Sequence, residues 1–316
     1  MQFQQEQLAL GSVVQISLVA RSSQSMAIDA LFSDLWKQAY TFERQFSRFL
    51  PQSELSFFNR QAGSKQRISP EFKKILTAAR DISLAVDGLY NPFILPALQA
   101  AGYGASLVKG HEHDMYDDFA NRKVVPIEKL EIGDSWAKIP QNSAIDLGGC
   151  GKGYLADQLA DSVTSKVKGY WISLGGDVVF GGVNAIGQPW QINVLKARSE
   201  TKPTTIAKVQ RDSKAKYAVA TSGTTARYGV KQGKLWHHLI DPRTLQPAET
   251  DILTATVCAP SGLLADVLAS CAVILGSEQA IQFLKQQGVS SALLQCRSSK
   301  EGDYNVHYGK IIKLDV

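Results

Sequence analysis

Several short polar segments contain residue types that could bind a diphosphate, a cation or a reacting hydroxyl group. In the stretch 146–154, four glycines lie between and beside Asp146 and Lys152. Glycines that lead into a helix let its first N–H groups approach a phosphate, the helix N-terminus favours the negative charge, and Lys152 adds a full cation. The stretch matches neither G-x-x-x-x-G-K-[ST] nor G-x-G-x-x-G. It predicts a diphosphate site, with a tight strand-to-helix turn as the alternative.

Two further segments supply carboxylates and hydroxyls. In 173–177 an apolar strand leads to two glycines and Asp177, and the alternative there is a turn in which Asp177 binds its own backbone. On an apolar helix that starts near Ser261, Asp266 and Ser270 are four residues apart and share one face. A carboxylate and a hydroxyl suit Mg²⁺, and Asp266 lies too far past the helix start to be an N-cap. We therefore expect a metal ligand at Asp266.

A histidine pair provides a candidate base. His238 follows His237 in the segment 236–242, and Asp241 lies three residues further on, in a stiff Asp-Pro step. Histidine is the usual general base near neutral pH, and Asp241 could orient its ring or bind a cation. Paired histidines are also ordinary strand residues, one pointing in and one out. The run 111–114, His-Glu-His-Asp, is interpreted as exposed surface rather than as a metal site.

Composition and charge exclude several classes of protein. The net charge of +5 over 316 residues is spread thinly, which argues against nucleic acid as a partner. The four cysteines form no C-x-x-C pair and are interpreted as small buried apolar residues. No window is apolar enough to span a bilayer and no signal peptide is visible. We expect a cytoplasmic protein as the sequence stands, or a periplasmic or membrane-anchored one if a leader was trimmed.

Hydrophobic periodicity predicts mixed helices and strands. Residues 14–18 alternate as a strand does, apolar residues over 28–46 recur at helical spacing, and Ser69 with Pro70 marks the start of another helix. From 146 onward, short strands follow one another through glycine turns, among them 170–174, 218–220 and 254–259. This favours an α+β fold with largely antiparallel sheets over a doubly wound parallel sheet. We expect one domain over 1–316, or two closely packed lobes.

Read in order, these segments resemble the ApbE family, the FAD:protein FMN transferases. The resemblance also rests on Leu10-Gly11-Ser12 and on the stretches 49–56, 87–92, 221–223 and 265–276, and it covers nearly the whole chain. Several motifs in the same order are far more specific than any one of them.

The resemblance implies helices flanking antiparallel sheets, with FAD in a central cleft and one or two Mg²⁺ ions beside its diphosphate. It implies that Gly149 offers a backbone oxygen to the metal, while Asp266 and Ser270 bind it with their side chains. His238 would be the base, with Asp241 as the second catalytic residue. The residues implied to contact FAD are Leu10, Phe49, Ala101, Gly102, Tyr103, Asp146, Lys152, Asp177, Thr221 and Ser222.

The implied reaction is a metal-assisted transfer in which a Ser or Thr hydroxyl of a target protein attacks the FMN phosphorus and AMP leaves. Family acceptors resemble Asp-Gly-x-[Ser/Thr]-Gly-Ala-[Ser/Thr], and this sequence has no such stretch, so the acceptor would be another protein. Two alternatives remain: an FAD diphosphatase that uses water at the same site, and a flavin-binding protein without catalysis.

The sequence departs from the family pattern at a few positions. Ser270 stands where threonine is usual, which keeps the hydroxyl. Leu245 replaces the glycine of Asp-Pro-x-Thr-Gly, which allows a different local turn.

Overall fold

The computed structural model describes residues 1–21, 25–103, 123–198, 203–210, 215–231, 234–298, 302–309 and 312–314. The run 111–114 therefore lies outside the described residues. The chain divides into a first unit of Met1–Tyr40, Lys152–Thr225 and Thr250–Val316, and a second unit of Thr41–Gly151 and Ala226–Glu249.

The first unit is built on an eight-stranded sheet in which every neighbouring pair of strands is antiparallel. In spatial order its strands are β1 (Gln2–Ala9), β2 (Ser12–Val19), β6 (Gly169–Leu174), β7 (Asp177–Gly182), β10 (Tyr217–Gly223), β15 (Ile252–Ala259), β16 (Ser291–Ser298) and β17 (Gly302–Tyr308). A second sheet of this unit has the order β18 (Ile312–Leu314), β9 (Thr205–Gln210) and β8 (Gln191–Leu195).

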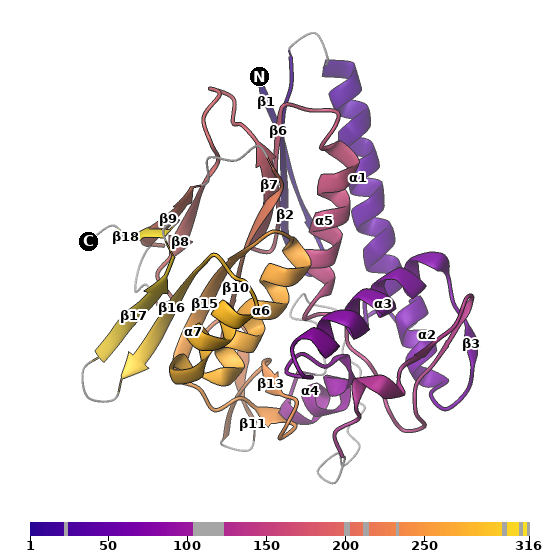
Figure 1. Cartoon of the computed structure of the whole chain (residues 1–316). Helices are drawn as coiled ribbons and strands as arrows, with labels where there is room; N and C mark the ends of the chain where they lie inside the picture. The colour runs from indigo at the N-terminus through magenta and orange to yellow at the C-terminus, as the bar shows by residue number, and fades with distance from the viewer. Residues whose placement is uncertain are drawn as a thin grey trace. The chain divides into compact units, whose positions relative to one another are not determined.

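Helices of the first unit pack on the large sheet (Figure 1). The helix α6 (Gly262–Leu275) contacts β10 and β15, and α7 (Ser277–Gln286) contacts β16. Most residues of α6 are buried, as expected for a helix that is apolar on all sides. The helices α1 (Ser25–Phe46) and α5 (Gly151–Val163) run beside one another, where Ser162 of α5 donates a hydrogen bond to Gln38 of α1 over 3.3 Å.

The second unit combines short helices with short antiparallel sheets. Its helical segments are α2 (Glu54–Arg60), α3 (Pro70–Ala85), the 3-10 helix η2 (Pro92–Ile94), α4 (Leu95–Ala101) and the 3-10 helix η3 (Ile127–Lys129). Its strands pair as β3 (Gln66–Arg67) with β5 (Trp136–Lys138), β4 (Glu131–Ile132) with β5, β11 (Tyr228–Lys231) with β12 (Lys234–His237), and β13 (Ile240–Asp241) with β14 (Gln246–Pro247).

The structure confirms the predicted α+β class with antiparallel sheets. The helix expected over 28–46 is α1, and Ser69 caps α3, its hydroxyl accepting the N–H of Phe72 over 3.1 Å. The strand expected at 14–18 is β2, but the chain begins one strand earlier, with β1. One face of this edge strand is exposed, and the partly buried face carries Gln5 and Gln7 between Phe3 and Ala9, so the strand shows little apolar alternation to recognise.

The structure also shows the environment of the cysteines and the character of the helices. All four cysteines are buried, as expected for small apolar residues. Within the part of the chain that the structure describes, no helix is both long enough and apolar enough to cross a membrane.

Candidate functional site

Two hairpin turns of the first unit lie on neighbouring strands. Leu10 and Gly11 join β1 to β2, and Gly175 and Gly176 join β6 to β7; all four residues have positive φ. The Gly175 N–H donates to the Val13 carbonyl over 2.9 Å, which ties the second turn to β2. A left-handed leucine costs about 1–2 kcal/mol, and such strain gathers at functional sites. Leu10, predicted to contact the flavin nucleotide, thus occupies a strained turn.

The predicted diphosphate lysine is held by a carboxylate beside the second turn. Lys152 Nζ lies 2.9 Å from Asp177 Oδ2, and both side chains are largely buried. The other oxygen, Asp177 Oδ1, accepts the backbone N–H of Thr221 over 3.2 Å. Asp177 therefore joins the glycine-rich helix start to β10, and the alternative in which it merely binds its own backbone is wrong.

The hydroxyls predicted at the end of β10 point to opposite faces of the sheet, as neighbours on a strand must. Ser222 Oγ lies 2.8 Å from Ser270 Oγ on α6, whereas Thr221 Oγ1 lies 2.9 Å from Thr256 Oγ1 on β15. Ser222 is thus placed with a predicted metal ligand. Thr221 reaches the cluster only through its backbone N–H.

The buried carboxylate of Asp266 lies one helical turn before Ser270. Its own helix is capped by Ser261, whose hydroxyl accepts the Leu264 N–H over 3.2 Å, so Asp266 is not that helix's N-cap. Instead Asp266 Oδ2 accepts the Gly153 N–H at the start of α5 over 3.1 Å. The residues Lys152, Asp177, Ser222, Asp266 and Ser270 thus form one linked polar cluster in the first unit.

These residues fit a magnesium ion by the chemistry of their donors. A buried carboxylate and a hydroxyl on one face of α6 are oxygen ligands, which a hard cation prefers. No group of three or more His, Cys, Asp or Glu side chains arranged to hold a metal is found among the described residues. Mg²⁺ commonly uses one or two carboxylates and completes its shell with water and substrate phosphates, so a single aspartate suffices.

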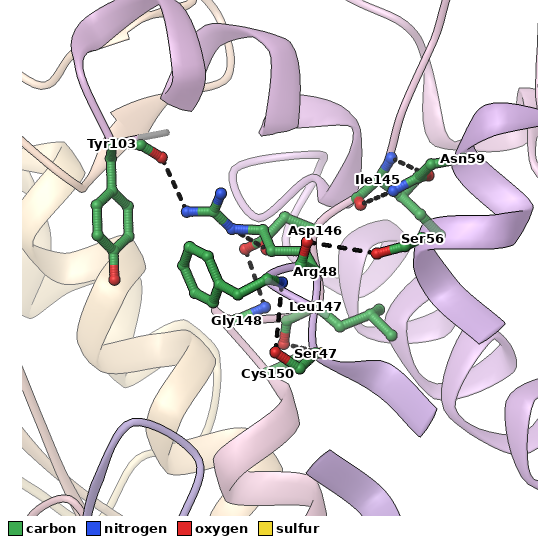
Figure 2. Close-up of polar contacts among 11 residues, drawn as sticks. Ser47, Arg48, Ser56, Asn59, Tyr103, Ile145, Asp146, Leu147, Gly148 and Cys150 are labelled. Carbon is green, nitrogen blue, oxygen red and sulfur yellow. Dashed lines mark hydrogen bonds and ion pairs between the residues drawn. The ribbon is translucent and has the colours of Figure 1, made fainter. Parts of the chain in front are cut away.

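In the second unit, Arg48 links three segments that the sequence predicted to contact FAD (Figure 2). Its Nε lies 3.0 Å from Asp146 Oδ1, and its Nη2 donates to the Tyr103 carbonyl over 2.9 Å. The guanidinium also lies over the rings of Phe49 and Tyr103, at 4.1 and 4.8 Å from their centroids. Only 6% of the Arg48 side chain is exposed, so this is a buried, multiply bonded ion pair.

The carboxylate of Asp146 also organises the glycine turn that follows it. Asp146 Oδ2 accepts the Gly148 N–H over 2.9 Å, while its backbone N–H donates to the Pro92 carbonyl over 2.8 Å. Gly149, the predicted backbone metal ligand, is the next residue of this turn, and a Cβ there would lie 3.3 Å from the Tyr90 ring. Asp146 therefore holds the conformation of the glycine turn in addition to pairing with Arg48.

Aromatic rings gather around Tyr103 in the second unit. Its ring centroid lies 6.1 Å from those of Phe49 and Trp236 and 6.2 Å from that of His238. Gly102 is needed here because a Cβ at that position would lie 2.8 Å from the Trp236 ring nitrogen. The neighbouring Ala101 packs against the small apolar cluster that contains Ile240. Phe49, Ala101, Gly102, Tyr103 and His238 thus lie near one another in the second unit.

The two histidines differ in role. The His238 ring lies edge-on to Tyr103, whereas His237 Nε2 lies 3.0 Å from the Ala248 carbonyl and its buried Nδ1 has no hydrogen-bond partner among the described residues. Because the carbonyl needs a donor, Nε2 carries the proton in the neutral ring. His237 is therefore a structural residue that ties the end of β12 to the residue after β14, and His238 is the candidate base.

We expect the pKa of His237 to make stability depend on pH. Burial lowers this pKa and outweighs the bond to Ala248, which raises it. The unfolded chain, with a histidine pKa of about 6.5, then binds more protons below that pH than the folded chain does. The free energy of unfolding should fall as pH drops below about 6.5. Urea titrations from pH 7.5 to 5 should show a flatter pH dependence in His237→Gln, whereas His307→Gln, at an exposed position of β17, should behave as the unaltered protein.

Asp241 is bound by Arg243. The backbone N–H and Nε of Arg243 each donate to Asp241 Oδ1 over 2.9 Å, and its Nη2 lies 2.8 Å from Oδ2. Burial alone would raise the pKa of Asp241, but the bonds from Arg243 outweigh it and the pKa is lowered. Asp241 is therefore a charged residue that fixes the turn after His238. That turn keeps a left-handed residue, since Leu245 has φ +57° where the family pattern has glycine.

Sequence reasoning missed Arg48, Trp236 as a ring partner, and Arg243 as the partner of Asp241. Arg48 precedes Phe49 in the chain, yet nothing in the local sequence distinguishes it from an exposed arginine. Its role depends on Asp146, nearly a hundred residues away in the chain.

Comparison with known proteins agrees with these observations. The model of the ApbE family matches residues 10–294. The FAD:protein FMN transferase of Haemophilus influenzae is 25% identical over 276 residues, which cover 84% of this chain and 77% of that protein. The FAD:protein FMN transferase of Escherichia coli K12 is 26% identical and covers 83% of this chain and 74% of that protein.

Solved structures show the same fold. The apo form of the flavinyl transferase ApbE from Pseudomonas stutzeri superposes with a TM-score of 0.81 at 22% identity, covering 97% of this chain and 94% of that one. The flavin transferase ApbE from Vibrio cholerae gives 0.78 at 23% identity, with 97% of each chain covered. Since the family model spans nearly the whole sequence, this chain belongs to the ApbE family.

Proposed function

We propose that this protein is a magnesium-dependent FAD:protein FMN transferase, which moves FMN from FAD to a Ser or Thr hydroxyl of another protein and releases AMP. The observation that carries the proposal is the polar cluster of the first unit, in which Lys152 pairs with Asp177, Asp266 accepts the N–H of Gly153 beside that lysine, and Ser270 lies against Ser222. A cation-binding carboxylate beside a helix N-terminus and a lysine suits a diphosphate. Relatives that carry the transferase name over most of this chain's length support the same activity.

The first unit would bind the diphosphate and its metal. Asp266 and Ser270 would hold Mg²⁺ with their side chains, and Lys152 would lie against the phosphates. A bound Mg²⁺ would offset the negative charge of the diphosphate and of the departing AMP oxygen. Asp177 keeps Lys152 in place, so this cation need not be ordered when the substrate binds.

The second unit would bind the planar ring systems and supply the base. The rings around Tyr103 suit stacking against a flavin or an adenine. Arg48 lies over two of these rings, those of Phe49 and Tyr103, and holds them in place. His238 would accept the proton of the acceptor hydroxyl as its oxygen bonds to the FMN phosphorus. The bond from that phosphorus to the AMP oxygen then breaks, and AMP leaves as the anion.

The proposal is tested by mixing the protein with FAD and Mg²⁺, with and without a protein fragment that carries the sequence Asp-Gly-x-Thr-Gly-Ala-Thr. We expect AMP to appear together with a flavin-fluorescent acceptor band on a denaturing gel, and the band to be lost when both Thr residues of the fragment's motif are replaced by Ala.

Other results would overturn the transferase assignment. AMP and free FMN in equal amounts, with no labelled acceptor, would identify an FAD diphosphatase. Bound FAD with no AMP would identify a flavin-binding protein.

A further inference from the structure

The starts of α5 and α6 share a sequence pattern. Gly153-Tyr-Leu-Ala-Asp157 and Gly262-Leu-Leu-Ala-Asp266 agree at four of five positions. In each helix the glycine and the aspartate are four residues apart, so both lie on one face.

The two segments bind each other reciprocally. Asp266 Oδ2 of α6 accepts the Gly153 N–H of α5 over 3.1 Å. In return, Asp157 Oδ1 of α5 accepts the Gly262 N–H over 2.9 Å, and Asp157 Oδ2 accepts the Leu263 N–H over 3.0 Å. Each carboxylate thus satisfies N–H groups that the first turn of the other helix cannot pair internally.

The paired glycines allow the two helices to approach this closely. A Cβ on Gly262 would lie 2.5 Å from the Gly153 carbonyl oxygen, and a Cβ on Gly153 would lie closer still to the Gly262 carbonyl oxygen. Backbone contact of this kind leaves no room for adjustment by side chains. The positions of Asp266 and Ser270 therefore depend on how the start of α6 is held against α5.

The pattern extends to a cation. Asp161 follows Asp157 by one turn, as Ser270 follows Asp266, and the Lys216 ammonium lies 3.4 Å from Asp157 Oδ1 and 2.8 Å from Asp161 Oδ1. The α5 segment thus binds a cation that the chain itself supplies, the Lys216 ammonium. The α6 segment carries the two side chains to which we assign Mg²⁺.

We propose that Asp157 is a positioning residue for the metal site, which acts through the first turn of α6 on Asp266 and Ser270. This inference rests on the proposed function. Both carboxylate oxygens of Asp157 accept N–H groups of α6. In Asp157→Asn an NH₂ group replaces one of these oxygens, so one α6 N–H loses its acceptor and meets a donor instead. The start of α6 then shifts or frays, and the metal ligands one and two turns along the helix lose their fixed placement.

The test compares Asp157→Asn with Asp161→Asn. Both replacements remove a carboxylate that binds Lys216, but only Asp157 contacts α6. We measure Mn²⁺ binding to the protein without FAD by electron paramagnetic resonance, and the Mg²⁺ concentration that gives half-maximal AMP release. For Asp157→Asn we expect the Mn²⁺ dissociation constant and the half-maximal Mg²⁺ concentration each to rise by about 10- to 100-fold. The rate of AMP release at saturating Mg²⁺ should stay close to that of the unaltered protein. Asp161→Asn should leave both values unchanged.

If Asp157→Asn does not fold, Asp157→Glu replaces it, since it keeps the charge while moving the oxygens by one methylene. A lower melting temperature and lower maximal rate with unchanged Mn²⁺ and Mg²⁺ midpoints would show that Asp157 serves only stability, and would overturn the inference while leaving the proposed function intact. Equal shifts in Asp161→Asn would assign the effect to Lys216 and overturn it too. If the unaltered protein neither binds Mn²⁺ nor needs Mg²⁺, the metal assignment fails and this inference fails with it.

Discussion

Replacing Asp266 with alanine should lower the rate of AMP release from FAD by about a thousandfold or more. Loss of a metal ligand removes charge stabilisation of several kcal/mol, and each 1.36 kcal/mol corresponds to about tenfold in rate. The same change leaves the buried Gly153 N–H without its carboxylate acceptor, which costs about 1–3 kcal/mol of stability. The rate is measured at saturating FAD over a range of Mg²⁺ concentrations, and the folded fraction is checked by circular dichroism.

Asp251→Ala separates the two effects. Asp251 also binds the start of a helix in the first unit, because its Oδ1 accepts the Ser277 N–H over 2.9 Å and its Oδ2 accepts the Ser277 hydroxyl. We place no ligand on it. This variant should lose about 0.5–2 kcal/mol of stability and keep its turnover. Turnover by Asp266→Ala equal to that of Asp251→Ala would show that Asp266 is only a helix-capping residue.

Local signals were sufficient for much of the fold. The Ser69-Pro70 start, the apolar spacing of α1 and the glycine turn before α5 depend on neighbours within a few residues, so the sequence predicts them well. The edge strand β1 was missed because most of its side chains are polar, and only its pairing with β2 makes it a strand. Strand pairing at an edge is a tertiary contact that propensity does not contain.

For the site, too, local signals were predictable from the sequence and tertiary contacts were not. The polar segments at strand ends were recognised by residue type, and the structure joins Lys152, Asp177 and Ser270 with their neighbours in one unit. The partner of each carboxylate was not predictable, because Arg48 and Asp146 meet only after folding. The two Gly-x-x-Ala-Asp segments lie more than a hundred residues apart, and their likeness gains meaning only when each aspartate is seen to bind the other segment's glycine.

Gly153→Ala should destabilise the protein by about 2 kcal/mol or more. Alanine favours an interior helical position by about 1 kcal/mol over glycine, but overpacking of a tight contact costs about 1–3 kcal/mol and sometimes more. Here the added methyl meets the backbone carbonyl of Gly262, which cannot move without shifting the whole of α6. Such a shift also lengthens the reciprocal bonds of Asp157 and Asp266, so the steric cost exceeds the gain in propensity.

Gly151→Ala is the matched control for this change. It lies two residues earlier at the start of the same helix, where an added Cβ would meet the Phe42 ring at an ordinary 3.6 Å. We expect its free energy of unfolding in urea to stay within about 1 kcal/mol of the unaltered protein, since only the propensity changes. Equal stability of Gly153→Ala and Gly151→Ala would mean that α5 and α6 separate without cost. In that case the reciprocal hydrogen bonds between the starts of α5 and α6 could not hold Asp266 and Ser270 in place.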